Sequence, residues 1–205
     1  MEISSLLFGM IIGLAVGLSP GPLITLVISE TLTKGKKEGI EVAVSVPISE
    51  LPISLFALVI LSSGAEKTIL LGVISLLGAC FLIYLGLANL RANVKESNHP
   101  GKDKALLKGI TTNLLNPNAY MFWLTIGGPK VLESVHVHSS VFMFFIFGFY
   151  MMLVGSKIAV AMVVDRSRTL AKSKYYTYIT RALGAVLIVF ALSFVRDALE
   201  FVGIL

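Results

Sequence analysis

The 205-residue chain has little charge and almost no cysteine. Charged residues make up 14% of it, against about 25% in an ordinary soluble domain. Its one cysteine, Cys80, can form neither an intramolecular disulfide nor a CxxC motif. Hydrophobic residues make up 56%, more than a globule of this size can hide, because much of a small domain lies at its surface. The composition excludes a disordered, collagen-like or disulfide-stapled chain and indicates a membrane protein.

The signatures of enzymes and cofactor proteins are also missing from the sequence. We find no glycine-rich phosphate loop, and no Ser/His/Asp constellation can be defended. His136 and His138 would supply only two metal ligands, which do not make a site. We therefore expect no catalytic residue, no bound metal and no cofactor.

Six long apolar runs predict membrane-spanning helices. A hydrocarbon core of about 30 Å needs about 20 helical residues, and the runs lie near 4–32, 39–62, 68–91, 106–129, 140–164 and 179–203. The first run starts with Glu2 instead of a basic segment, so we expect a span and not a cleaved signal peptide. The expected fold is an all-α polytopic membrane protein with six transmembrane helices, in a single membrane domain over 1–205.

Lysine and arginine are concentrated in alternate loops. The first, third and fifth loops hold 13 of the 17 basic residues, and basic loops stay in the cytoplasm. We therefore expect a multi-pass protein of the cell (plasma) membrane with both termini outside. The basic excess is an orientation signal and requires no nucleic-acid partner.

The loop 92–105 is the polar linker that divides the chain into two sets of three spans, 1–91 and 106–205. With both termini outside, this linker is cytoplasmic. Because three is an odd number, the second set must cross the membrane upside down relative to the first. The sequence thus predicts two inverted three-helix repeats.

Proline interrupts the first span of each predicted repeat. The sequence SPGP contains Pro20, 14 residues before Lys34, and NPN contains Pro117, 13 residues before Lys130. Both motifs therefore lie near the bilayer middle, and both are typical of a new helix that starts there. Plain proline kinks are the alternative. Matched breaks in two inverted halves favour a transporter binding site, where new helix starts offer N–H groups to an anion.

Two ionisable residues lie deep inside spans. Glu50 is halfway along the second span, between Pro47 and Pro52, and Lys157 lies in the fifth. Such residues are costly in a membrane and usually serve a function. Glu50 could contact substrate or carry a proton, or it could simply bond to a neighbouring helix. Lys157 could bind substrate, or serve as a structural partner of Glu50 or of helix carbonyls, whereas Glu30 is expected to be solvated or paired with a lysine.

Other polar and aromatic residues are open to two interpretations. Asn113 and Asn116 flank the break in the fourth span, where their amides could bind substrate or cap the half-helix. Tyr84, Tyr120 and Trp123 could line a cavity, but aromatic residues in membrane helices more often pack or anchor the interface.

Small residues recur every four positions along the first span. Ser5 is followed by Gly9, Gly13, Gly17 and Gly21, which makes a ridge that another helix can approach closely. Packing within the bundle is the favoured interpretation, and a homodimer contact is the alternative.

Four segments give the chain a resemblance to a known family. They are GLSPGP (17–22), GACFLIYLGLANLR (78–91), KGITTNLLNPNAYMFW (108–123) and, more loosely, RALGAVL (181–187). Together they resemble the LysE/RhtB superfamily of amino-acid exporters over nearly the whole length. The resemblance implies six spans and export of amino acids or related small metabolites, driven by ion gradients.

The chain departs from that family pattern at several positions, which include the unusual prolines Pro47 and Pro52 on either side of the acid. Ser45 and Ser49 stand where glycine is usual, the acid is Glu50 where members commonly have aspartate, and Asn118 replaces a frequent lysine. The resemblance therefore does not imply lysine as the substrate.

The leading hypothesis is a secondary exporter with its site at the bilayer middle. In it the half-helix starts bind a carboxylate, and Glu50 binds an ammonium group or carries the coupled proton. A cation or metal exporter of related build and a non-transport membrane scaffold are the alternatives. The predicted substrate-binding residues are Pro20, Gly21, Pro22, Glu50, Asn113, Asn116, Pro117 and Lys157.

Overall fold

The computed structural model describes residues 2–63, 68–91, 104–131, 139–168, 173–201 and 203. Within these residues the regular structure is entirely helical, as predicted. Most of the predicted linker, 92–103, and both His136 and His138 lie outside the described residues. The helices are α1 (Glu2–Leu18), α2 (Pro22–Lys34), α3 (Lys36–Ser63), α4 (Thr68–Arg91), α5 (Ala105–Leu114), α6 (Pro117–Phe122), the π-helix η1 (Trp123–Gly127), α8 (Ser139–Arg168) and α9 (Ser173–Phe201).

Several of these helices are long and apolar enough to cross a membrane. In the described part of the chain, four qualify alone: Lys36–Ser63, Leu71–Arg91, Ser140–Ser167 and Thr177–Phe201. Helices α1 and α2 qualify together, with a bend of 63° at the break between them. Residues 105–131 are divided into shorter helices, because α5 ends before Asn116 and η1 interrupts the α-helical pattern. The sixth span therefore stays a prediction.

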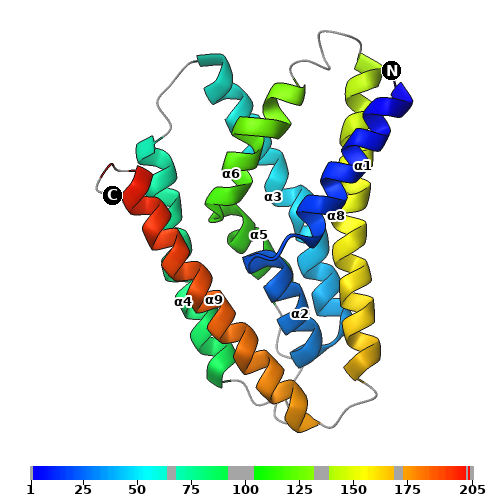
Figure 1. Ribbon diagram of the computed structural model, residues 1–205. Helices are drawn as coiled ribbons and strands as arrows, with labels where there is room; N and C mark the ends of the chain where they lie inside the picture. The colour runs from blue at the N-terminus through cyan, green and yellow to red at the C-terminus, as the bar shows by residue number, and fades with distance from the viewer. Residues whose placement is uncertain are drawn as a thin grey trace.

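The helices form two outer pairs with a broken layer between them (Figure 1). Helix α4 lies along α9 on one side, and α1 lies along α8 on the other. Helices α2, α3, α5 and α6 lie between the pairs, so both interrupted segments reach the middle of the bundle. The beginning of α1 and the end of α9 both lie in the upper half of the molecule in this view.

Glycines bring α1 and α8 into close contact. A Cβ atom at Gly9 or Gly13 would overlap backbone atoms of α8, and one at Gly17 would overlap the hydroxyl of Ser156. Ser5 continues this face by donating a hydrogen bond from Oγ to a backbone carbonyl of α8. The ridge of small residues therefore packs within the bundle, which confirms the favoured interpretation. Gly21 is not part of this contact, since a Cβ atom there would meet only the carbonyl oxygen of Ser19, at 4.0 Å, and no atom of α8.

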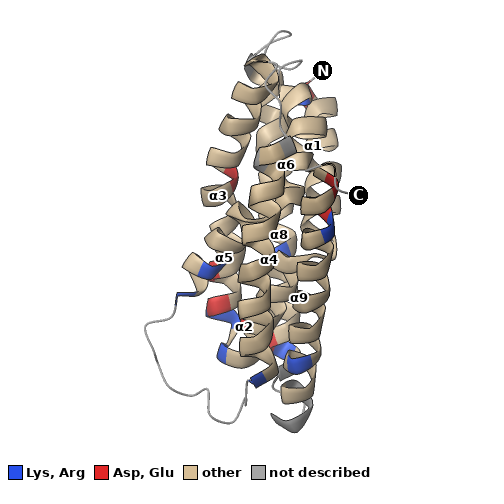
Figure 2. Cartoon of the chain, turned by 90° about the vertical axis from the view of Figure 1, so that its left-hand side faces the viewer, with Lys and Arg blue, Asp and Glu red and all other residues tan. Residues whose placement is uncertain are grey.

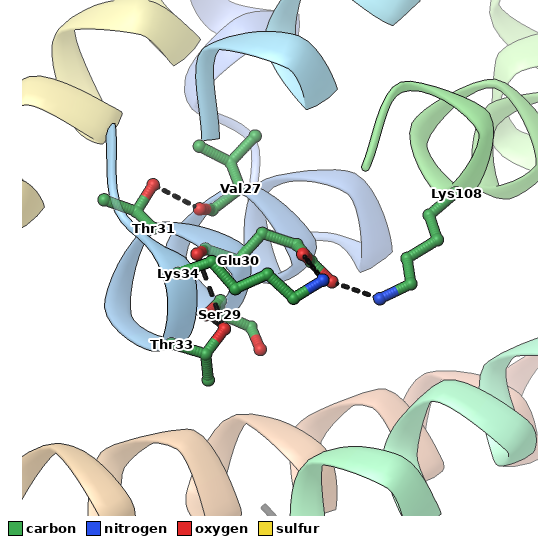
Figure 3. Close-up of polar contacts among 7 residues, drawn as sticks. All are labelled: Val27, Ser29, Glu30, Thr31, Thr33, Lys34 and Lys108. Atoms are coloured by element: carbon green, nitrogen blue, oxygen red, sulfur yellow. Dashed lines mark hydrogen bonds and ion pairs between the residues drawn. The ribbon is translucent and has the colours of Figure 1, made fainter. Parts of the chain in front are cut away.

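Basic residues gather at the lower end of the bundle, around the end of α2, the beginning of α5 and the beginning of α9 (Figure 2). A buried acid joins two of these helices there (Figure 3). Glu30 of α2 is 4% exposed; its carboxylate lies 2.9 Å from Lys34 Nζ on the same helix and 2.5 Å from Lys108 Nζ on α5. Glu30 is therefore paired with lysines, and its second pair fastens α2 to α5.

Candidate functional site

Both helix breaks open onto one cavity of about 340 Å³ in the middle of the bundle. Its wall is made by the end of α1, the beginning of α2, the middle of α3, the junction of α5 with α6, and α8. The lining residues are Val16, Ser19, Pro20, Gly21, Pro22, Leu23, Ile24, Val46, Glu50, Asn113, Asn116, Asn118, Ala119, Phe122, Leu153 and Lys157.

The first break leaves a helix start that faces this cavity. Gly21 is the N-cap of α2 in an extended conformation, and no side chain caps the helix there. Pro22, at the first helical position, has no N–H to satisfy. The N–H groups of Leu23 and Ile24, both cavity-lining residues, belong to the first turn and have no intrahelical partner. This end of α2 therefore presents donors and the positive end of the helix dipole.

The second break is capped by its own residues. Asn116 is the N-cap of α6, and its Oδ1 accepts a hydrogen bond of 3.1 Å from the backbone N–H of Asn118. Tyr120 donates from its hydroxyl to the carbonyl of Leu114 at 2.9 Å, which ties α6 back to the end of α5. Pro117 is buried behind the cavity wall and is not among its lining residues. Asn116 thus acts as a cap and also lines the cavity.

Glu50 is held in the wall by donors from the chain's second half. It lies in α3, which runs unbroken past Pro47 and Pro52, and it is 5% exposed. The indole Nε1 of Trp123 donates to its Oε2. The amide Nδ2 of Asn113 lies 3.5 Å from Oε1 and donates more closely, at 2.9 Å, to the hydroxyl of Ser49. Glu50 therefore sits at the contact of α3 with α5 and η1.

Lys157 caps the end of α1. Its Nζ donates to the carbonyl of Gly17 at 2.9 Å, and the residue is 4% exposed. That carbonyl lies in the last turn of α1, where carbonyls lack helical partners and carry partial negative charge. The sequence left two structural partners open for Lys157, Glu50 and helix carbonyls, and the structure shows a helix carbonyl. No ion pair of 4.0 Å or less joins Lys157 to Glu50 in this part of the described chain.

The structure brings seven of the eight predicted site residues to the cavity, and the exception is Pro117. Their function as a binding site stays a prediction. The sequence interpretation of Trp123 as a packing or anchor residue was incomplete, because this buried side chain also bonds to Glu50. The usable signal was the position of Trp123 seven residues after Asn116, two helical turns beyond the break, on a face that can reach the cavity wall.

The cavity is lined by one acidic group, one basic group and the uncapped start of α2. Such a site can bind a small molecule that carries both an anionic and a cationic group. No cluster of three His, Cys, Asp or Glu side chains suited to a metal ion occurs among the residues that the structure describes.

Comparison with known proteins identifies one family. The family model described as LysE type translocator matches residues 14–198. The match begins in α1 and ends in α9, so it includes every residue that lines the cavity. No curated protein and no solved structure matches the chain.

Proposed function

The chain belongs to the LysE type translocator family, and on that premise we propose that it is a secondary transporter that exports amino acids or related small metabolites. Membership of this family, together with its apolar helices, identifies the chain as a multi-pass membrane transport protein. The amino-acid cargo and the coupling to an ion gradient are our proposal.

One observation carries this proposal: a cavity between two interrupted helices contains Glu50 and Lys157 without a direct ion pair between them. A transport site near the middle of a bundle is typically built from such interrupted helices. Buried charges are expensive in a membrane protein and are kept where a function needs them. A cavity of about 340 Å³ suits a small metabolite, at the lower end of the usual range of ligand pockets.

The charges suggest how an amino acid would lie in the cavity. Its carboxylate would accept hydrogen bonds from Lys157 and from the N–H groups of Leu23 and Ile24 at the start of α2. Its ammonium group would donate to Glu50, which also lines the cavity. Where Glu50 carries the coupled proton instead, the ammonium binds to Asn113 and the other polar groups of the wall.

The packing of the helices supports two inverted repeats, 1–91 and 106–205. The first half of the first broken segment, α1, packs along α8, and the first half of the second, α5, packs along α3. Since α3 and α8 hold the same place in the two repeats, a twofold axis in the membrane plane would exchange these contacts. We infer that the two halves rock about the cavity, as inverted repeats do in other transporters.

The distribution of charge supports the orientation. Lysine and arginine gather at one end of the bundle (Figure 2), and such ends face the cytoplasm. Both termini would then lie outside the cell membrane. A tag at either terminus should be accessible to protease in intact cells, and protection of both tags would reverse the orientation.

The direct test is counterflow of labelled amino acids in proteoliposomes, with Glu50→Gln as the variant. A matched control is Glu41→Gln, since Glu41 belongs to the same helix but forms only an exposed ion pair of 3.9 Å with Lys37. We expect the wild type and Glu41→Gln to accumulate label. Failure of every amino acid to exchange, under every ion gradient, would exclude the proposed cargo.

The same variant separates the two functions of Glu50. If the carboxylate binds the ammonium group, Glu50→Gln loses both counterflow and gradient-driven transport, by roughly tenfold for each 1.4 kcal/mol of lost binding. If it carries the proton, Glu50→Gln keeps counterflow and loses only the response to a proton gradient. Retention of both activities would show that Glu50 has neither function.

A further inference from the structure

The two carboxylate oxygens of Glu50 have unequal surroundings. Oε2 accepts a hydrogen bond from the indole of Trp123, a residue that is 1% exposed and does not line the cavity. Oε1 faces the amide of Asn113, which does line the cavity, at 3.5 Å. That distance is at the long limit for a hydrogen bond. Oε2 is therefore bonded to a residue outside the cavity wall, whereas the partner of Oε1 belongs to that wall and lies at the limit of hydrogen-bond distance.

The chemistry of the two partners makes this difference permanent. An indole N–H can only donate, so the oxygen that it contacts must accept whether or not Glu50 holds a proton. A carboxamide can donate from its nitrogen or accept at its oxygen. Asn113 can therefore donate to Oε1 when that oxygen is unprotonated, and after rotation of its amide it can accept from Oε1 when that oxygen carries a proton. Trp123 can only donate, so Oε2 must stay an unprotonated acceptor.

The indole is held in place by its neighbours. Phe122 and Phe149 contact it edge to face, with ring centroids 5.6 Å and 5.9 Å from that of Trp123. On another side, a Cβ atom at Gly127 would lie 2.7 Å from Cε3 of the indole, so glycine leaves the space that the ring fills. Trp123 also opens η1, and such π-helical turns are frequent at functional sites. A ring packed this tightly keeps its N–H directed at Glu50.

We propose that Trp123 is a positioning residue that keeps Oε2 of Glu50 occupied and so reserves Oε1 for the transported ion or cargo. This inference rests on the proposed transport function and specifies the atom at which it acts. When a proton binds, a hydronium ion in the cavity transfers it to Oε1, where an O–H bond forms and a water molecule remains. When an ammonium group binds, it donates to Oε1. Oε2 stays bonded to Trp123 in both events.

The first experiment uses the fact that Trp123 is the chain's single tryptophan. Its fluorescence, recorded in purified protein during a pH titration, should show a transition as the adjacent charge of Glu50 is neutralised. Among the residues that the structure describes, the ionisable groups that interact electrostatically with Glu50 are Lys157 and Tyr150, both on α8. We therefore expect Tyr150→Phe and Lys157→Met to keep a transition and Glu50→Gln to lose it. The proposal would be overturned if the wild-type emission did not change with pH, or if the transition were still present in Glu50→Gln.

The second experiment tests positioning through the pH profile of transport. Trp123→Phe removes the donor but keeps an aromatic ring, and we expect the midpoint of the profile to move to higher pH by about one to two units. That shift corresponds to the 10- to 100-fold preference that a hydrogen bond gives to a charged acceptor. Phe145→Leu removes a ring that stacks on Phe149, 6.2 Å between centroids, and leaves Trp123 and its two ring partners in place, so its midpoint should stay at the wild-type pH. Equal midpoints in Trp123→Phe and wild type, or equal shifts in both variants, would refute positioning.

The two proposals fail in different ways. The fluorescence titration needs no transported cargo, so it can succeed where every amino acid fails to exchange. Conversely, amino-acid transport with an unchanged pH profile in Trp123→Phe would leave the proposed function intact and remove the positioning function of Trp123.

Discussion

The contact between α1 and α8 provides a sharp prediction, because it depends on the absence of side chains. A Cβ atom at Gly13 would lie 2.9 Å from the carbonyl carbon and 3.0 Å from the Cα of Phe149, and closer still to its carbonyl oxygen. These are backbone atoms, which cannot rotate away as the tip of a side chain can. Gly13→Ala therefore forces the two helices apart along a line of close packing.

The expected magnitude follows from two opposing effects. Overpacking of a well-packed contact costs about 1–3 kcal/mol, whereas Gly→Ala in a helix gains about 1 kcal/mol of helix propensity. Gly155→Ala in α8 is the matched control, because a Cβ atom there meets nothing within 4 Å. Gly155→Ala should therefore show only the gain of about 1 kcal/mol in helix propensity. The difference between the two variants then isolates the steric cost of about 1–3 kcal/mol.

Thermal unfolding in one detergent, followed by circular dichroism, measures this difference. In a chain of this size 1 kcal/mol moves Tm by about 2–4 °C, so Gly13→Ala should melt about 2–12 °C below Gly155→Ala. If Gly13→Ala melts at or above the control, α1 and α8 do not approach each other as closely as the structure shows.

Three further predictions concern the charged and capping residues. Lys108→Met should lower the free energy of unfolding by about 1–2 kcal/mol. Loss of a fully buried pair costs roughly 3–5 kcal/mol, but here Glu30 keeps Lys34 as a second partner. The control Lys37→Met removes an exposed pair and should change the melting temperature little. Lys157→Met should weaken transport of amino acids at least tenfold in KM and leave competition by the corresponding decarboxylated amines unchanged; equal losses for both would refute carboxylate binding at this lysine. Asn116→Ala removes the cap of α6 and should cost about 1 kcal/mol, measured as a lower melting temperature that Asn116→Asp restores.

The helix breaks and the buried charges could be predicted because the rest of the sequence is so apolar. Against long hydrophobic runs, each proline and each charge stands out, and the cost of placing it in a membrane is a physical reason to expect a special position. The breaks at Pro20 and Pro117 and the cavity positions of Glu50 and Lys157 follow from that reasoning. No comparable cost marks an aromatic residue, so Trp123 looked like ordinary packing.

Contacts between distant residues could not be read from the sequence. Trp123 and Glu50 are 73 positions apart, and Lys108 and Glu30 are 78 apart. Each pair depends on how α5 and η1 pack against the first half of the chain, which local patterns do not specify. The π-helix η1 was missed for a related reason, since one extra residue in a turn leaves the apolar pattern almost unchanged.

The interruption of the first span also explains why Glu50 and Lys157 do not neutralise each other. In an unbroken helix the carbonyl of Gly17 would accept from the N–H of Gly21, four residues on. Because α1 ends at Leu18, that carbonyl is free to accept from Lys157 instead, at 2.9 Å. The ammonium group is thus stabilised by partial charges at a helix end and needs no carboxylate partner. Glu50 is held in turn by uncharged donors, so two opposite charges can share one cavity and remain available to a ligand that carries both.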